Sequence, residues 1–252
     1  MYLVRPLMSG IPRNTPIIIG VWSSMFLVFW TFQAGGVIPN PLVVAQSFLS
    51  LFAGAKIIPD LVASLTLNVE ATLISTGISL LISYLFVLPA FRPVSLLISK
   101  LRYLGLSGLT FLLGLIVSGH ELKLGLLVFG MSTFFVTSMV SVISDISTDS
   151  WRHARSLRMS PWRATLEVVV FGTFDSALEI LRQNSAVGWI MLTTVEILSQ
   201  SEGGIGVVLR NANRGFRMDD IFAVQILILL IGLGQDALLG FLKRALCPYS
   251  TR

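Results

Sequence analysis

Charged residues are scarce in this sequence. Only 12% of the 252 residues are Asp, Glu, Lys or Arg, whereas 54% are hydrophobic. Soluble globular domains carry about 25% charged residues. Half of that charge cannot cover the surface of a globule of this size, which argues against a soluble enzyme. The high apolar content also argues against a disordered chain. The composition therefore predicts an integral membrane protein.

Cysteine, histidine and recognisable catalytic motifs are also scarce. Cys247 is the single cysteine, which excludes an internal disulfide and a multi-cysteine metal site. His120 and His153 lie far apart, without metal-ligand spacing around either, so we predict no metal site. No G-x-x-x-x-G-K-[ST] motif occurs, and residues 203–206 are interpreted as a glycine turn because they lack the context of a dinucleotide motif. We expect no catalysis and no cofactor in this chain.

Long apolar runs dominate instead. About 20 residues cross the ~30 Å hydrocarbon core as a helix. Barrel strands would alternate polar and apolar residues, so continuous runs favour helices. The predicted fold is therefore all-α, with a short amphipathic helix at the membrane surface near residues 42–52. Six spans are predicted, at residues 16–32, 61–88, 103–118, 122–143, 184–198 and 221–242.

The basic residues predict an orientation. If the N-terminus lies in the cytoplasm, 13 of the 18 Lys and Arg residues lie inside, as the positive-inside rule requires. Six spans then place both termini in the cytoplasm. We predict a cytoplasmic N-terminus (1–15), one transmembrane domain (16–249) and a short C-terminal tail (250–252). The net charge of +5 is attributed to topology and lipid headgroups, so nucleic acid is not an expected partner.

Polar residues inside predicted spans are candidates for a translocation path. Asn68, Glu70 and Glu196 are costly in lipid and should face protein or a water-filled cavity. Structural hydrogen bonds between helices are the alternative, as is closeness of Glu196 to the outer water. Gln235 and Asp236 are predicted to serve helix packing.

A dense polar segment at residues 149–163 separates the fourth and fifth predicted spans. Its arginines could anchor to anionic lipid headgroups, at ~1 kcal/mol each. Alternatively, its apolar residues Leu157 and Trp162 could enter a groove of a partner protein. Farther along, Glu179 and Arg182 are spaced to pair on one helix face.

Three arginines recur on the predicted outer side, at Arg210, Arg214 and Arg217, followed by Asp219 and Asp220. They could contact an acidic patch of a binding protein or an anionic substrate, or form a solvated face. These three interpretations stay open.

An ordered series of short stretches resembles the permease subunits of binding-protein-dependent ABC importers, which have the type I importer fold. The nearest resemblance is to the nitrate/sulfonate/taurine/bicarbonate group, and it extends over about residues 37–249. The stretches are residues 38–44, 61–65, 154–157, 160, 162–163, 182, 188–190, 196–198, 203–206, 216–219, 236 and 248–249.

The resemblance implies roles for two segments. Residues 149–163 would form the cytoplasmic loop that couples to an ATPase subunit, and the outer loop would dock an extracytoplasmic solute-binding protein. The implied coupling residues are Arg152, Ala154, Arg155, Leu157, Arg158, Ser160 and Trp162. The implied docking residues are Arg210, Arg214, Arg217 and Asp219.

The coupling loop departs from the family pattern. Arg152 replaces an acidic residue and Arg158 replaces a glycine, while Phe171 and Asp175 replace two prolines. These changes invert a charge and are expected to remove a flexible turn. Either the loop docks on a diverged ATPase, or the chain pairs with a second permease that carries an intact loop.

The resemblance implies ATP-driven import by alternating access, with ATP and Mg bound on the partner ATPase. Two permease chains, identical or different, would enclose the path in a bacterial inner membrane. The implied solute is small and polar, with an anion as one candidate. The alternative is a secondary transporter or membrane scaffold without an ATPase, but the lack of an internal repeat weighs against a transporter of that kind. An export permease is disfavoured because the outer loop resembles an importer's docking loop.

Overall fold

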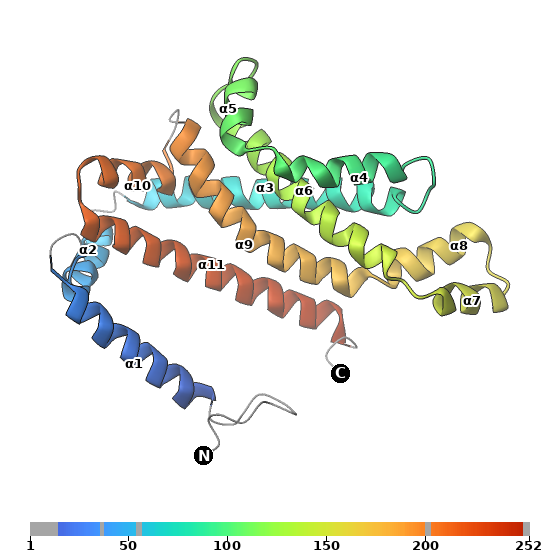
Figure 1. Cartoon of the computed structure of the whole chain (residues 1–252), viewed down its shortest axis with the longest axis horizontal. Helices are drawn as coiled ribbons and strands as arrows, with labels where there is room; N and C mark the ends of the chain where they lie inside the picture. Colours follow the sequence, from blue (N-terminus) through green and yellow to red (C-terminus); the bar gives the residue numbers. More distant parts are fainter. Residues whose placement is uncertain (1–14, 36–37, 54–56, 200–202, 249–252) are drawn as a thin grey trace.

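The structure is a computed structural model that describes residues 15–35, 38–53, 57–199 and 203–248. Over these residues it is built from helices (Figure 1), with no strand beyond one bridge between Gly35 and Ile38. The all-α prediction is therefore confirmed. The helices are α1 (Thr15–Gln33), α2 (Pro41–Ala53), α3 (Ile57–Leu85), α4 (Arg92–Lys100), the 3₁₀ turn η1 (Leu101–Tyr103), α5 (Leu106–Gly114), α6 (Gly119–Ser144), α7 (Thr148–Ser156), α8 (Pro161–Thr165), the π-helix η2 (Leu166–Phe171), α9 (Phe174–Ser199), α10 (Ile205–Arg214) and α11 (Met218–Leu246).

Within the described residues, three helices, α3, α6 and α11, are long and apolar enough to cross a membrane. The segment from Arg92 to Gly114 would add a fourth crossing if its two parts form one broken span, because they meet at an angle of 102°. Leu104 and Gly105 are extended, which breaks the helix between η1 and α5. The continuous span predicted over residues 103–118 is therefore wrong: α5 has 9 residues and measures about 14 Å at 1.5 Å per residue.

The first and fifth predicted spans are also helical, but they differ in their surroundings. α1 has 19 residues, and its large apolar side chains are mostly exposed. α9 has 26 residues and contains Arg182, Asn184 and Glu196, so it is less apolar than a lipid-facing helix. It packs against α3, α6, α10 and α11, which explains how it accommodates these polar groups.

Among the described residues the core has three buried apolar clusters, and the two largest form where α6 packs between α3 and α9. The third, of Ile57, Ile205, Val224 and Leu227, lies where α10 and α11 meet the start of α3. Apolar residues outside these clusters are largely exposed on α1, α5 and α11, as expected for helices that face lipid. The first core cluster consists of Leu67, Ala71, Leu122, Leu126, Leu127, Met131, Trp189, Leu192 and Val195. The second core cluster consists of Phe135, Met139, Ile143, Val169, Ala177 and Ile180.

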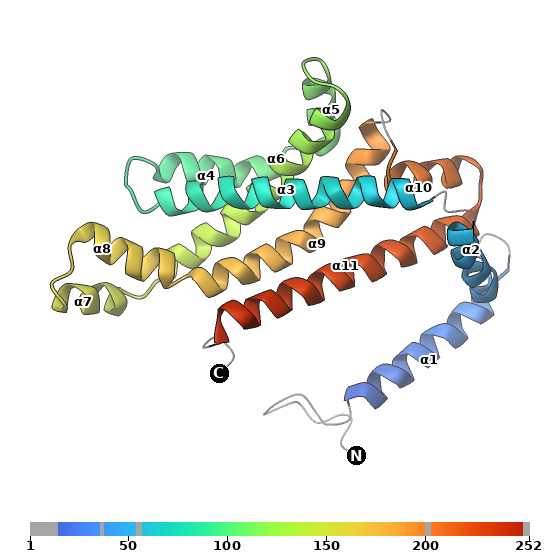
Figure 2. The same cartoon turned by 180° about the vertical axis from the view of Figure 1, so that it is seen from behind.

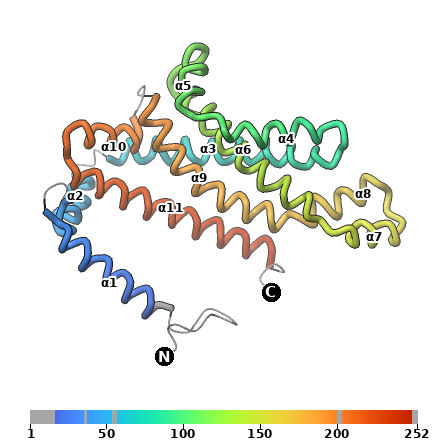
Figure 3. Tube along the Cα trace, in the orientation of Figure 1, coloured from blue at the N-terminus to red at the C-terminus, as the bar shows by residue number. Residues whose placement is uncertain are grey.

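The molecule is elongated, with distinct ends. α7 and α8 lie at one end of the long axis and α2 and α10 at the other (Figures 1 and 2). α5 stands away from the bundle, whereas the start of α1 and the end of α11 point toward the same side (Figure 3). The segments predicted to meet an ATPase and a binding protein are thus at opposite ends.

Candidate functional site

The predicted coupling segment is an ordered pair of short helices, α7 and α8. Ser147 Oγ accepts a hydrogen bond from Ser150 N (3.3 Å) at the start of α7. Ser160 Oγ accepts one from Arg163 N (3.4 Å) at the start of α8, where Pro161 fits the first helical turn. The sequence therefore specifies both helix starts, and Ser160 has a structural role as a cap.

The side chains of this segment divide into two groups. Ala154 is buried, and Trp151 packs against the second core cluster, so the segment is anchored to the bundle. Leu157 and Trp162 are instead exposed, at 56% and 70%. Their exposure leaves two large apolar side chains available at the end of the molecule. The remaining predicted coupling residues, Arg152, Arg155 and Arg158, are also exposed.

Arg158 adopts the left-handed backbone conformation that glycine usually supplies, with φ of 53°. Arg158 N donates to Arg155 O (2.9 Å) and Met159 N donates to Ala154 O (3.3 Å), which is the Schellman arrangement at a helix end. The expectation that the arginine removes the turn is therefore wrong. The hydrogen bonds keep the turn despite the steric cost of a side chain at this position.

The segment continues into α9 through the π-helix η2 and Gly172. A Cβ atom at Gly172 would overlap Val168 O, so only glycine fits without a backbone shift. π-helical turns are rare and recur at functional sites. The coupling segment and α9 are thus joined through one irregular, tightly packed turn.

An ion-pair network joins α9 to α11 near this turn. Arg182 donates to both carboxylate oxygens of Asp236, at 2.6 and 2.8 Å. Glu179 accepts from Lys243 (2.8 Å) and lies 3.8 Å from Arg182, which confirms the predicted pairing of Glu179 with Arg182. The network borders a cavity of about 330 Å³ that also contacts the buried Cys247. A bidentate pair fixes orientation as well as distance, so these contacts hold α9 and α11 in register.

Glu196 is buried at the opposite end of α9, where it holds the turn that begins α10. One of its carboxylate oxygens accepts from Ser64 Oγ, and the other accepts from Gly206 N (2.7 Å). Ser64 Oγ also accepts from Ile205 N (2.9 Å), and Asp60 accepts from Gly204 N (2.8 Å). Side chains from α3 and α9 thus satisfy the free amides at the start of α10.

The glycines of this turn are required by packing. A Cβ atom at Gly203 would overlap Asp60, and one at Gly204, where φ is 137°, would overlap Glu196. Lys123 is buried beside the turn and donates to Gly203 O (3.2 Å). The glycine-turn interpretation of residues 203–206 is confirmed. The contacts of Glu196 agree with the structural alternative for this residue.

The three path candidates do not form one site. Asn68 is buried and donates to Gln235 (3.1 Å), which also accepts from Trp189 (2.6 Å). Glu70 is half-exposed and lies 3.1 Å from His120. The predicted packing role of Gln235 is confirmed, as is that of Asp236 through Arg182.

The predicted docking residues around α10 are mostly engaged within the chain. Arg210 donates to Ile197 O (3.3 Å), Arg217 pairs with Asp220 (2.9 Å) and Asp219 accepts from Ser47 (2.7 Å). Arg214 is exposed. These contacts brace the loop around α10 against α2 and α9.

Phe216, next to these arginines, lies in one of the stretches that resemble the permease family, but the sequence predicted no role for it. It has a φ of 54° and is 83% exposed. Phe216 N donates to Asn213 O (3.1 Å) and Arg217 N to Ala212 O (3.0 Å), so α10 ends in the same Schellman arrangement as α7. The aromatic ring of Phe216 is thus exposed, although its backbone has the left-handed conformation, which is unfavourable for a residue with a Cβ atom.

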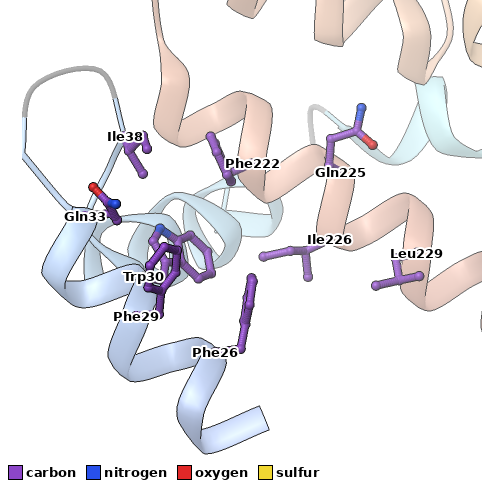
Figure 4. A pocket seen from close by; sticks show the side chains of 9 residues that line it. All are labelled: Phe26, Phe29, Trp30, Gln33, Ile38, Phe222, Gln225, Ile226 and Leu229. Carbon is purple, nitrogen blue, oxygen red and sulfur yellow. The ribbon is translucent and has the colours of Figure 1, made fainter. Parts of the chain in front are cut away.

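A large apolar cavity of about 710 Å³ separates α1 from α11 (Figure 4). Phe26, Phe29 and Trp30 of α1 face Phe222 and Ile226 of α11 across it. The ring centroids of Trp30 and Phe222 lie 5.7 Å apart, and Trp30 Nε1 donates to Pro39 O (3.1 Å). These contacts of α1 with α11 thus come from the C-terminal half of α1.

Sequence reasoning missed Asp60, Ser64 and Lys123 as parts of the α10 turn. Asp60 and Ser64 lie four residues apart on one face of α3, which is the local signal that could have paired them. Lys123 had no such local signal, because its hydrogen bond to Gly203 O joins residues that are 80 positions apart in the sequence. Among the described residues, no group of three or more His, Cys, Asp or Glu side chains is placed to hold a metal ion.

Comparison with known proteins gives one informative similarity. No known family matches the chain. A protein of Methanocaldococcus jannaschii named as an ABC transporter permease is 32% identical over 78 residues. The match covers 31% of this chain and 29% of that protein, so it spans less than a third of either. This similarity and the apolar helices support a multi-pass membrane protein related to transport permeases.

Proposed function

We propose that this chain is the transmembrane subunit of an ATP-driven ABC importer that moves a small polar solute by alternating access. The similarity to a named permease supports the transport class. In this proposal the six predicted spans form a type I importer fold, with α4 and α5 as a broken third crossing. The chain itself does no covalent chemistry, and ATP and Mg bind to the partner ATPase.

The observation that carries the proposal is the shape of α7 and α8. This helix pair is anchored through Trp151 and Ala154 but presents Leu157 and Trp162 outward. An apolar side chain that fills a groove of a partner is a recurrent way for a helix to dock. Arg152 and Arg155 flank these side chains and would pair with acidic residues on the ATPase, because the acidic residue typical of the family is replaced by Arg152.

The other end of the molecule supports docking of a solute-binding protein. Phe216 and Arg214 are exposed there, while Arg210, Arg217 and Asp219 stabilise the loop that displays them. Aromatic and arginine side chains are enriched at the energetic centres of protein interfaces. Asn68, Glu70 and Glu196 remain candidates for the path, with Glu196 in a supporting role.

A second permease chain would complete the path. α1 is predominantly apolar and most of its large side chains are exposed, so much of its surface is available to another chain or to lipid. The chain is proposed to reside in a bacterial inner membrane with both termini in the cytoplasm.

The experiment is purification of the tagged chain from its own cells, followed by identification of the proteins that copurify. We expect an ABC ATPase and a solute-binding protein. Leu157→Glu and Arg155→Glu should reduce recovery of the ATPase, because one places a charge in an apolar groove and the other reverses a charge. Ser156→Glu, an exposed change on the same helix, is the matched control.

The alternative is a secondary transporter or scaffold that acts without an ATPase. Recovery of the chain as a homo-oligomer alone, with assembly and transport unaffected by Leu157→Glu, would support that alternative and reject the importer.

A further inference from the structure

A band of polar side chains crosses the middle of the bundle formed by α3, α6 and α9. On α6, the first core cluster ends at Met131 and the second begins at Phe135. On α9, the second cluster ends at Ile180 and the first begins at Trp189. The residues between the clusters are mostly small or polar, which is unusual for the centre of an apolar bundle. Buried members of the band are Asn68, Thr72 and Ser75 on α3, Ser132 and Thr133 on α6, and Asn184, Ser185 and Gly188 on α9.

Asn184 is the central member of this band. Its side chain is 4% exposed, and neither its Oδ1 nor its Nδ2 has a hydrogen-bond partner among the residues that the structure describes. Within the same described part of the chain, Asn68 Oδ1, Thr72 Oγ1 and Ser132 Oγ are likewise buried without partners. A buried donor or acceptor without a partner destabilises a fold, because it has lost its hydrogen bonds to water and gained none in return.

Helix register places these groups close together. Gly188 packs directly against Asn68 Oδ1 and Met131, each about 3.0 Å from where its Cβ would lie. Asn184 is one turn before Gly188, and Thr72 is one turn after Asn68. α3 and α9 run in opposite directions (Figure 1), so one turn back along α9 and one turn forward along α3 lead the same way. Asn184 and Thr72 therefore lie at the same height along the bundle.

We propose that this band is a hydration site, in which ordered water bridges Asn184 to Thr72 and Asn68. Buried water typically makes about three hydrogen bonds to polar groups that the protein leaves unpaired. The site offers both donors and acceptors, from an amide and from hydroxyls, as water requires. A groove of about 470 Å³ among α3, α9 and α11, bordered by Thr72 and Thr76, provides an approach.

Charge distinguishes water from a cation at this site. None of the buried members of the band is acidic. Glu70 is half-exposed and paired with His120, and Asp236 is paired with Arg182. A cation in the band would have no neighbouring negative charge, which is costly in a membrane interior. The inference rests on the packing of the bundle and is independent of the proposed import function.

Radiolytic hydroxyl-radical labelling of the full chain in nanodiscs tests the proposal, because bound water generates radicals that modify adjacent side chains. Met131 and Met139 are both fully buried, but Met131 packs against Gly188 of the band, whereas Met139 belongs to the second core cluster. We expect Met131 to be oxidised several-fold faster than Met139. Equal rates would overturn the proposal without the need for any variant.

A double variant and a change of cation provide two further tests of the site. Asn184→Leu combined with Thr72→Val should lower Met131 oxidation to the rate of Met139, because apolar side chains exclude water from the band. Unchanged oxidation of Met131 in a folded double variant would contradict the site. Replacement of sodium by choline should leave labelling unaltered. Protection of Met131 by sodium alone would assign the band to a cation and reject water.

Discussion

At the scale of single residues, two residues in the described part of the chain have the left-handed backbone conformation that favours glycine. Arg158 and Phe216 each follow a helix end in a Schellman arrangement, and each is exposed. Such a conformation costs about 1–2 kcal/mol for a residue with a Cβ atom. The two lie at opposite ends of the molecule, in the two segments that we propose to dock partners. Strain retained at an exposed side chain points to a role for that side chain.

Arg158→Gly should stabilise the chain by about 1 kcal/mol, because glycine relieves the left-handed strain while the Schellman hydrogen bonds remain. Reversible unfolding in mixed micelles measures this free energy. Arg158→Ala keeps a Cβ atom and should change stability little. A destabilising glycine would mean that the arginine side chain contributes more than its backbone strain costs.

Gly204→Ala should destabilise the chain by about 2 kcal/mol or more, because it combines backbone strain with overlap against Glu196. The same micelle unfolding assay applies. Gly77→Ala on α3 is the matched control, since its Cβ would meet nothing within 4 Å. That change should be neutral or should stabilise by up to ~1 kcal/mol, from helix propensity. Similar effects of the two substitutions would contradict the packing of the α10 turn.

At the scale of helices, hydropathy did not predict the break between η1 and α5. Leu104 and Gly105 are apolar or neutral, so the apolar run continues across them, yet both are extended. Hydropathy likewise did not predict the π-helix before Gly172. Hydropathy reports where a chain avoids water, whereas a bend depends on which neighbours the two halves contact. α4 packs on α6, with Ser99 and Thr137 hydroxyls 2.8 Å apart, and α5 does not continue along that line.

Reversal of one charge should test the link between α9 and α11. Arg182→Asp places three carboxylates together and should destabilise the chain, though only modestly because Arg182 and Asp236 are 36% and 40% exposed to solvent. Asp236→Arg in the same chain should restore most of the loss. Unfolding of the single and double variants forms the thermodynamic cycle.

The exposed pair Arg152–Asp149 provides the control for that cycle. Its side chains are 76% and 84% exposed, so charge reversal there should change stability by less than ~0.5 kcal/mol. If the swap at Arg182 and Asp236 fails to recover stability, or if both pairs behave alike, the ion-pair network does not hold the helices together.

At the scale of the whole molecule, the proposed orientation places the two exposed segments on opposite faces of the membrane. Cys247 is the only cysteine, so Cys247→Ser gives a background for labelling single cysteines. We expect Leu157→Cys to react with an impermeant maleimide from the cytoplasmic face alone. Phe216→Cys should react from the outer face alone. Labelling of both positions from one face would reject the orientation.

The sequence by itself determined the membrane class, the helical fold, the glycine turn and the Glu179–Arg182 pair. Each follows from composition or from residues within one or two helical turns, where geometry is nearly independent of the rest of the chain. Only the tertiary structure decided the partners of the polar groups. Glu196 bonds to Ser64, 132 residues away, and Arg182 bonds to Asp236, 54 residues away. The reason is physical: a buried polar group must find a partner, but the packing of distant helices selects which one.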